Sequence, residues 1–196
     1  MRCYRIMLLL AVCALVASSV ARAQTWQIDP MHSAAQFSVR HLGISTVRGQ
    51  FEKLSGSVTY DPAALGKTSI SASIDANSVN TRVEMRDNDL RSPNFFDVAK
   101  YPTITFKSKR IDPSGPGQLK VVGDLTIHGV TKEVTLDVDG PTPVIKDPMG
   151  NSRMGASAST KINRRDFGVN GAPTMAGDEV VITLDIELFA PQPPGK

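Results

Sequence analysis

The sequence predicts an all-β domain of eight antiparallel strands with one short helical connection near residues 82–96. Apolar and polar side chains alternate in eight segments, as they do in strands that bury one face. Turn residues such as Asp61-Pro62, His128-Gly129 and Asp139-Gly140 separate these segments. The gaps are mostly shorter than the dozen residues that a parallel crossover needs. A closed barrel and a two-sheet sandwich both satisfy this pattern.

The N-terminal half supplies four of the strands. Every second residue is apolar or small in 35–41, apart from His41 at its end, and in 70–76, and 103–107 repeats the pattern. Segment 47–60 is less regular, because its apolar residues change parity part-way along. This change predicts a β-bulge near Lys53.

The C-terminal half supplies the other four strands, at 119–127, 134–138, 153–162 and 180–188. The last of these carries the longest apolar stripe. Several inward positions of the predicted sheet are small, which is compatible either with close packing or with an empty interior. These positions are Ala35, Ala72, Ala76, Ala156 and Ala158.

A helix is expected between the strands at 70–76 and 103–107. Thr81 and Glu84 have the spacing of a capping box, in which each side chain bonds the other residue's backbone amide. Ser92-Pro93 should end the helix, because the residue before proline disfavours helical geometry. We expect this connection to cover a sheet edge or a barrel mouth.

The first 23 residues have the three parts of a secretory signal peptide: early arginines, a short apolar run from Ile6 to Ala17, and small residues at the cleavage site. The run is too short for the roughly 20 residues of a membrane-spanning helix, and Cys13 lacks a lipoprotein context. We expect cleavage after Ala23, a periplasmic domain at 24–190, a disordered tail at 191–196 and no stable membrane insertion.

Loss of the signal peptide changes the composition. Both cysteines lie in it, so the mature chain would have no disulfide and no thiol chemistry. Three arginines leave as well, so that 19 basic residues balance 19 acidic ones. A neutral chain argues against nucleic acid or an anionic membrane surface as a general partner.

Sequence motifs for catalysis or metal binding are weak. The three histidines, His32, His41 and His128, are far apart and form no paired ligand motif. No nucleophile elbow or phosphate-binding loop is found in the sequence. We therefore expect no cofactor, no metal and no enzymatic activity.

Seven phrases, taken in order, resemble the YceI-like, polyisoprenoid-binding family over residues 26–188. Two positions differ from its pattern: Asp89 stands in place of a histidine and Met149 in place of a tryptophan. The phrases are DPMHS at 29–33, FSVRHLG at 37–43, VRGQF at 47–51, RDNDLRSPNFFD at 86–97, KYP at 100–102, GDLTIHGVTK at 123–132 and NRRDFG at 163–168.

The resemblance implies a lipocalin-like eight-stranded barrel that holds an amphiphilic isoprenoid, such as a polyprenyl phosphate or a quinone, and has no established enzymatic activity. The alternative from the residues alone is an ordinary filled core. If the barrel is hollow, the side chains expected to contact the lipid tail are Phe37, Val39, Phe51, Ile74, Ile104, Phe106, Leu125, Ile127, Leu136, Met154, Ile182 and Ile186.

A polar cluster near the helical connection is the candidate head-group site, because arginine forks suit phosphate or carboxylate groups. The alternative is a network of rim ion pairs, with Arg86 or Arg91 bound to neighbouring aspartates. Two other functions stay open: an envelope-stress interaction module with a filled core that acts through a partner protein, and an enzyme acting on the head group. Whether the chain forms a homodimer is a separate open question. The cluster consists of Arg40, His41, Arg48, Arg86, Asp87 and Arg91.

Overall fold

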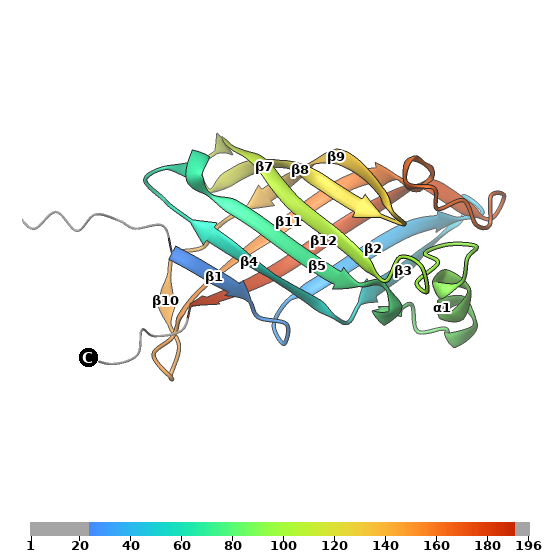
Figure 1. The fold of residues 1–196 in the computed structure, drawn as a ribbon, viewed down its shortest axis with the longest axis horizontal. Coiled ribbons are helices and arrows are strands. Elements are labelled where there is room, and N and C mark those ends of the chain that lie inside the picture. The colour runs from blue at the N-terminus through green and yellow to red at the C-terminus, as the bar shows by residue number, and fades with distance from the viewer. Residues whose placement is uncertain (1–23, 191–196) are drawn as a thin grey trace, which may run out of the picture.

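A computed structural model describes residues 24–190. The expected signal peptide at 1–23 and the expected tail at 191–196 lie outside the described residues. Twelve β-strands join into one antiparallel sheet that curls into a barrel, with the helix at one end (Figure 1). The strands are β1 (Gln24–Ile28), β2 (Ala34–His41), β3 (Ser45–Phe51), β4 (Leu54–Tyr60), β5 (Ser69–Asp75), β6 (Val79–Asn80), β7 (Thr103–Gly115), β8 (Gln118–Ile127), β9 (Val130–Asp139), β10 (Ile145–Lys146), β11 (Ser152–Asn163) and β12 (Ala176–Ala190).

Pairing between β11 and β12 closes the barrel, with a register that runs from Ser152 opposite Ala190 to Asn163 opposite Glu179. Short strands share places in the wall. β1 and β2 pair, one after the other, with the same edge of β12. On their far side, β4 pairs with β1, and β3 pairs with β2. The wall therefore has eight strand positions, and all the pairings are antiparallel.

All eight predicted segments form strands, but two of their details were wrong. Segment 47–60 is not one bulged strand: it breaks at Glu52 and Lys53 into β3 and β4. The break lets β3 pair with β2 and β6 while β4 pairs with β1 and β5. The segment predicted at 103–107 extends to Gly115, because Pro113 lies at an irregularity of the β7–β8 ladder that tolerates it.

The helix α1 (Glu84–Arg91) is shorter than the expected connection, and the capping box is wrong. Val83 precedes the helix and makes no side-chain cap bond. Thr81 instead donates its backbone N–H and its hydroxyl to Oδ1 of Asp87. The end of the helix was predicted correctly, since Ser92 is the first residue after it. This helix lacks the length and apolarity to cross a bilayer, and it is the one α-helix among residues 24–190.

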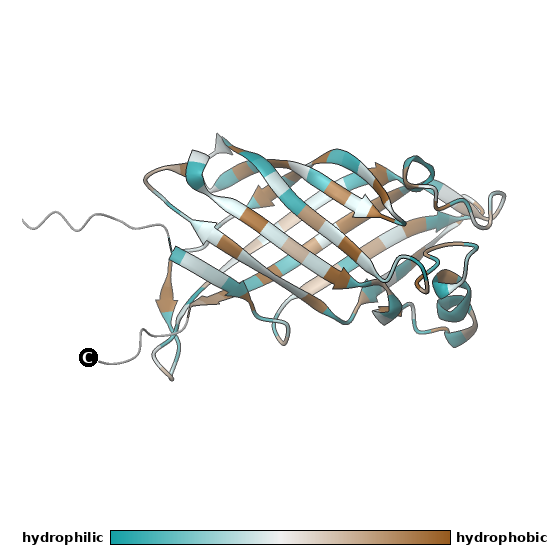
Figure 2. Ribbon diagram, in the orientation of Figure 1, coloured by the Kyte–Doolittle hydropathy of each residue, from teal (hydrophilic) through white to brown (hydrophobic). Residues whose placement is uncertain are grey.

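Brown and teal bands alternate along many of the strands (Figure 2). The apolar side chains of this alternation line the inside of the barrel. The buried apolar residues form three clusters, which partly buried residues such as Ile74 and Leu184 connect. One centres on Trp26 and Leu54, one on Phe95 and Phe167, and one on Val121. Residues of all three clusters line the interior cavity described next.

Candidate functional site: an apolar cavity in the barrel

A cavity of about 290 Å³ occupies the barrel interior. Its lining extends from Tyr60 and Thr68, where β4 ends and β5 begins, to Phe95 and Phe167 at the α1 end. Each of β1 to β5, β7 to β9, β11 and β12 contributes at least one side chain. The lining is apolar except for a few residues, which are Gln36, Tyr60, Thr68, Thr105, Thr160 and Arg164.

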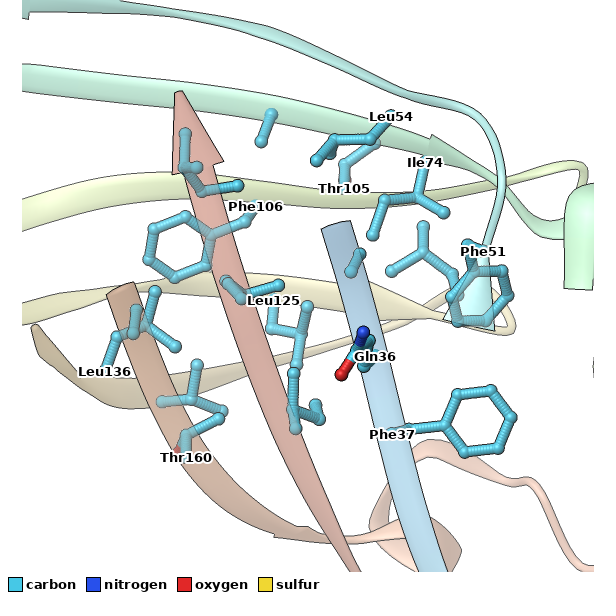
Figure 3. Close-up of a pocket in the computed structure, with 18 of the residues that line it drawn as sticks. Gln36, Phe37, Phe51, Leu54, Ile74, Thr105, Phe106, Leu125, Leu136 and Thr160 are labelled. Atoms are coloured by element: carbon cyan, nitrogen blue, oxygen red, sulfur yellow. The ribbon is translucent and has the colours of Figure 1, made fainter. Parts of the chain in front are cut away.

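The twelve residues predicted to contact the lipid tail all line this cavity. Figure 3 shows Phe51, Ile74, Phe106, Leu125 and Leu136 around it, carried by five different strands. The structure therefore brings the predicted set together, and its contact with a ligand stays a prediction. A filled core would have left no such space.

Aromatic side chains line the cavity near α1. The ring centroids of Phe37 and Phe51 are 5.7 Å apart, and those of Phe51 and Phe96 are also 5.7 Å apart. Gly49 makes room for this arrangement, because a Cβ at that position would lie 2.4 Å from Cζ of Phe37. Phe96 comes from the segment after α1 and carries no periodic signal, so strand parity did not identify it.

A buried arginine organises the loop that closes this end of the barrel. Arg164 is only 5% exposed, and its guanidinium donates to the backbone carbonyls of Val169, Gly171, Ala176 and Gly177. Burial lowers the pKa of Arg164 from its ordinary value. The carbonyl oxygens replace the water that the cation loses, so Arg164 fixes the chain between β11 and β12.

Three residues of the predicted head-group cluster lie on α1, and their side chains form hydrogen bonds within the protein. Arg86 donates to the carbonyl and the hydroxyl of Thr81. Arg91 donates to the carbonyls of Asn77 and Val79, and Asp87, 6% exposed, accepts the two bonds from Thr81. These bonds attach α1 to β6 and to the turn before it.

The expected rim ion pairs are not what this cluster forms. Among residues 24–190, neither Arg86 nor Arg91 lies within 4.0 Å of a carboxylate oxygen. The other three candidates, Arg40, His41 and Arg48, lie on β2 and β3. In the described part of the chain, no hydrogen bond or ion pair joins them to the helix-borne three.

Sequence reasoning missed a second charged cluster, centred on Arg153 at the start of β11. Its guanidinium donates to Asp29 at 2.7 Å, to Asp147 at 2.8 Å and to Glu187 at 2.6 Å. These bonds lower the pKa of Asp147 to about 2 and hold that of Asp29 well below its usual range. The cluster joins the β1–β2 connection, the turn before β11 and the end of β12.

Three potential metal ligands belong to this cluster: donor atoms of Asp29, His32 and Glu187 lie within 4.8 Å of one another. One nitrogen of Arg153, Nη1, bonds both carboxylates. The guanidinium therefore supplies the positive charge that these oxygens need, and the arrangement acts as a brace between loops.

Comparisons with known proteins agree with this architecture. The model of the YceI-like domain matches residues 26–188. A UPF0312 protein of Vibrio cholerae is 38% identical over 151 residues, which are 76% of this chain and 79% of that protein. A UPF0312 protein of Vibrio parahaemolyticus is 34% identical over 170 residues, 86% of each chain.

Solved structures share the fold. The YceI protein of Campylobacter jejuni has a TM-score of 0.68 at 33% identity, covering 78% of this chain and 90% of its own. BcnA of Burkholderia cenocepacia has a TM-score of 0.72 at 26% identity, covering 82% and 98%. A domain of Saccharophagus degradans described as polyisoprenoid-binding has a TM-score of 0.65 at 19% identity, covering 85% and 98%. By its sequence and its fold, this chain belongs to the YceI-like family.

Proposed function

We propose that this protein binds an amphiphilic isoprenoid lipid, of the polyprenyl phosphate or isoprenoid quinone type, and carries or stores it in the periplasm. The observation that supports this most is the apolar cavity that extends through the barrel. The fold shared with a domain described as polyisoprenoid-binding is consistent with it. The proposal is one of binding, without a chemical step.

Apolar burial supplies the binding free energy in this proposal. Each buried methylene contributes about 0.8 kcal/mol, so a few isoprene units offset the loss of freedom of a threaded chain. Leu125, Ile104 and Leu136 are nearly buried yet border the cavity, so their side chains are already ordered before a tail arrives. Little conformational entropy is then lost on the protein's side.

The head group belongs outside the barrel, because a phosphate or hydroxyl placed among these side chains would lose its water without gaining hydrogen bonds. Arg86 and Arg91 already donate to carbonyl oxygens of the chain. The side chain of Arg48 is exposed and makes no hydrogen bond or ion pair in the described part of the chain. Arg48, with Arg40 and His41 nearby on β2 and β3, is therefore the more suitable head-group contact.

The test is organic extraction of the protein purified from its own cells without detergent, followed by mass spectrometry. We expect an isoprenoid at close to one molecule per chain. An unrelated exported protein purified in parallel controls for lipid carried over from membranes. Repeated recovery of no lipid, or of the same lipids at the same level in the control, would contradict the proposal. Fractionation of the cells tests the location independently.

A further inference from the structure

Two loops lie at the α1 end of the barrel (Figure 1). Both expose large apolar side chains. Leu42 and Ile44, in the turn between β2 and β3, are 54% and 79% exposed, and Met175, just before β12, is 50% exposed. The backbone N–H of Leu42 donates to the carbonyl of Met175 at 2.8 Å, so the two loops form one surface. We call Leu42, Ile44 and Met175 the apolar tip.

Leu42 is an unusual choice for its position. Its φ of 50° lies in the left-handed region, which glycine, asparagine and aspartate adopt more readily than a bulky side chain. More than half of this leucine is also exposed to solvent. Leucine is unfavourable here both for its backbone conformation and for its contact with water. A contact outside the barrel explains this choice better than folding does.

Two arginines flank the apolar tip. Arg40 is held across the turn by hydrogen bonds to Oγ1 of Thr46 at 2.9 Å and to the carbonyl of Gly43 at 2.7 Å. Arg48 is exposed on β3. Within residues 24–190, neither guanidinium has a carboxylate oxygen within 4.0 Å. The tip therefore combines apolar side chains with two cations that no carboxylate of the described residues neutralises, although the guanidinium of Arg40 also donates within the turn.

The opposite end of the barrel also exposes apolar side chains, but its arginine is neutralised. Val144, Ile145 and Met149 are exposed there, at 54%, 62% and 76%. The nearby guanidinium of Arg153, however, is already bound to carboxylates, among them that of Asp147. The side chain of Lys146, beside Ile145, is exposed and donates only to the carbonyl of Gly150 and the hydroxyl of Ser152 among the described residues. With two un-neutralised arginines at the apolar tip and one such lysine beside Ile145, an anionic surface would be attracted more strongly to the tip.

The apolar tip is also continuous with the cavity. His41, which precedes Leu42, pairs with Ala176, which follows Met175. Ala176 and Val39 both line the cavity. The ladder between β2 and β12 is irregular from Ala176 to Val180, directly beside the tip. Only a few residues of the chain therefore separate the apolar tip from the cavity wall, so a lipid tail that leaves a bilayer at the tip would meet that wall.

We propose that the apolar tip docks on the surface of a phospholipid bilayer, with Leu42, Ile44 and Met175 at the boundary of the acyl chains and with Arg40 and Arg48 on lipid phosphates. This inference rests on the proposed function, because docking gives the isoprenoid a path between membrane and barrel. The mature chain as a whole is expected to be neutral, so the attraction is local to this end of the barrel. The contact is peripheral, like that of other shallowly inserted apolar segments.

Co-sedimentation with vesicles tests the docking. The mature protein is mixed with vesicles of equal parts phosphatidylglycerol and phosphatidylethanolamine, or of phosphatidylcholine alone. The double variant Leu42→Ser/Ile44→Ser should bind the anionic vesicles about tenfold less tightly or worse. Arg40→Gln and Arg48→Gln should each cost about fivefold on anionic vesicles. The matched control, Val144→Ser/Ile145→Ser, removes two exposed apolar side chains from the opposite end and should bind like the unaltered protein.

The outcomes separate docking from lipid binding. Equal loss of vesicle binding in the tip variant and the control variant would overturn the docking proposal, as would no binding by the unaltered protein. A tip variant that changes the oligomeric state while vesicle binding is unaltered would assign the surface to a second copy of the chain and would also overturn it. Lipid extracted from the same preparations reports on the proposed function: docking can fail while the barrel still contains lipid. Met175→Ser, outside the strained turn, gives a second tip variant should Leu42→Ser unfold.

Discussion

Filling the cavity from within its own wall should remove lipid binding without harming the fold. Ala158 lies on β11 opposite Val138 and Leu184, is half-buried and borders the cavity. Ala158→Phe places a six-carbon ring where a tail would lie. At about 0.8 kcal/mol per methylene, displacing as much tail costs up to about 5 kcal/mol, or three to four orders of magnitude in Kd. A tail that shifts within the cavity would lose less.

The assay is titration with a fluorescent polyprenyl probe, supported by the amount of lipid that co-purifies. Ser159→Phe is the matched control, because the neighbouring side chain is exposed on the outer face of the same strand. The control should bind normally, and both variants should keep a thermal unfolding midpoint near that of the unaltered protein. An unchanged Kd for Ala158→Phe, or an equal loss in Ser159→Phe, would refute the reasoning.

Three further predictions concern stability. Gly49→Ala should lower the free energy of unfolding by about 1–3 kcal/mol, because the new methyl overlaps the ring of Phe37. Gly66→Ala, which has open space around the new methyl, should leave the free energy of unfolding unchanged, and thermal unfolding measures both variants. Asp87→Ala should lower the free energy of unfolding by about 1–3 kcal/mol and speed hydrogen exchange in α1, because the buried amide of Thr81 loses its partner. The bound lipid should remain, and its loss in this variant would place Asp87 in the ligand site instead. The pKa of Asp147 is lowered from 3.8 to about 2, so its stabilising effect is present above pH 3.8 and is lost as the pH falls towards 2. The thermal unfolding midpoint should therefore fall between pH 3.8 and pH 2, and it should fall less in Arg153→Gln.

The strands could be predicted because each buries one face, and that requirement is written into the sequence as alternation. The stripe at 180–188, for example, became the inward face of β12. The break at Glu52 and Lys53 could not be distinguished from a bulge, because both reverse the parity of the following residues. Which strand each half would join depends on pairing across the barrel, and periodicity carries no such information.

The cavity lining was predictable for a related reason, since strand parity alone selects inward side chains such as Phe106 and Leu125. Whether these side chains fill the interior or surround a space depends on barrel geometry, and here the family resemblance decided the prediction. The capping box failed because Thr81 bonds Asp87, a partner that local spacing does not favour over Glu84. The roles of Arg153 and Arg164 depend on residues brought together only by the folded loops, so no sequence motif indicated them.

Electron density inside the barrel tests the central claim most directly. A crystal structure of the protein purified without detergent should have continuous, chain-like density along the cavity, in contact with Phe51, Leu125 and Leu136. Well-ordered density for the empty barrel, with its own side chains collapsed into the 290 Å³ cavity or with water alone in it, would contradict the account.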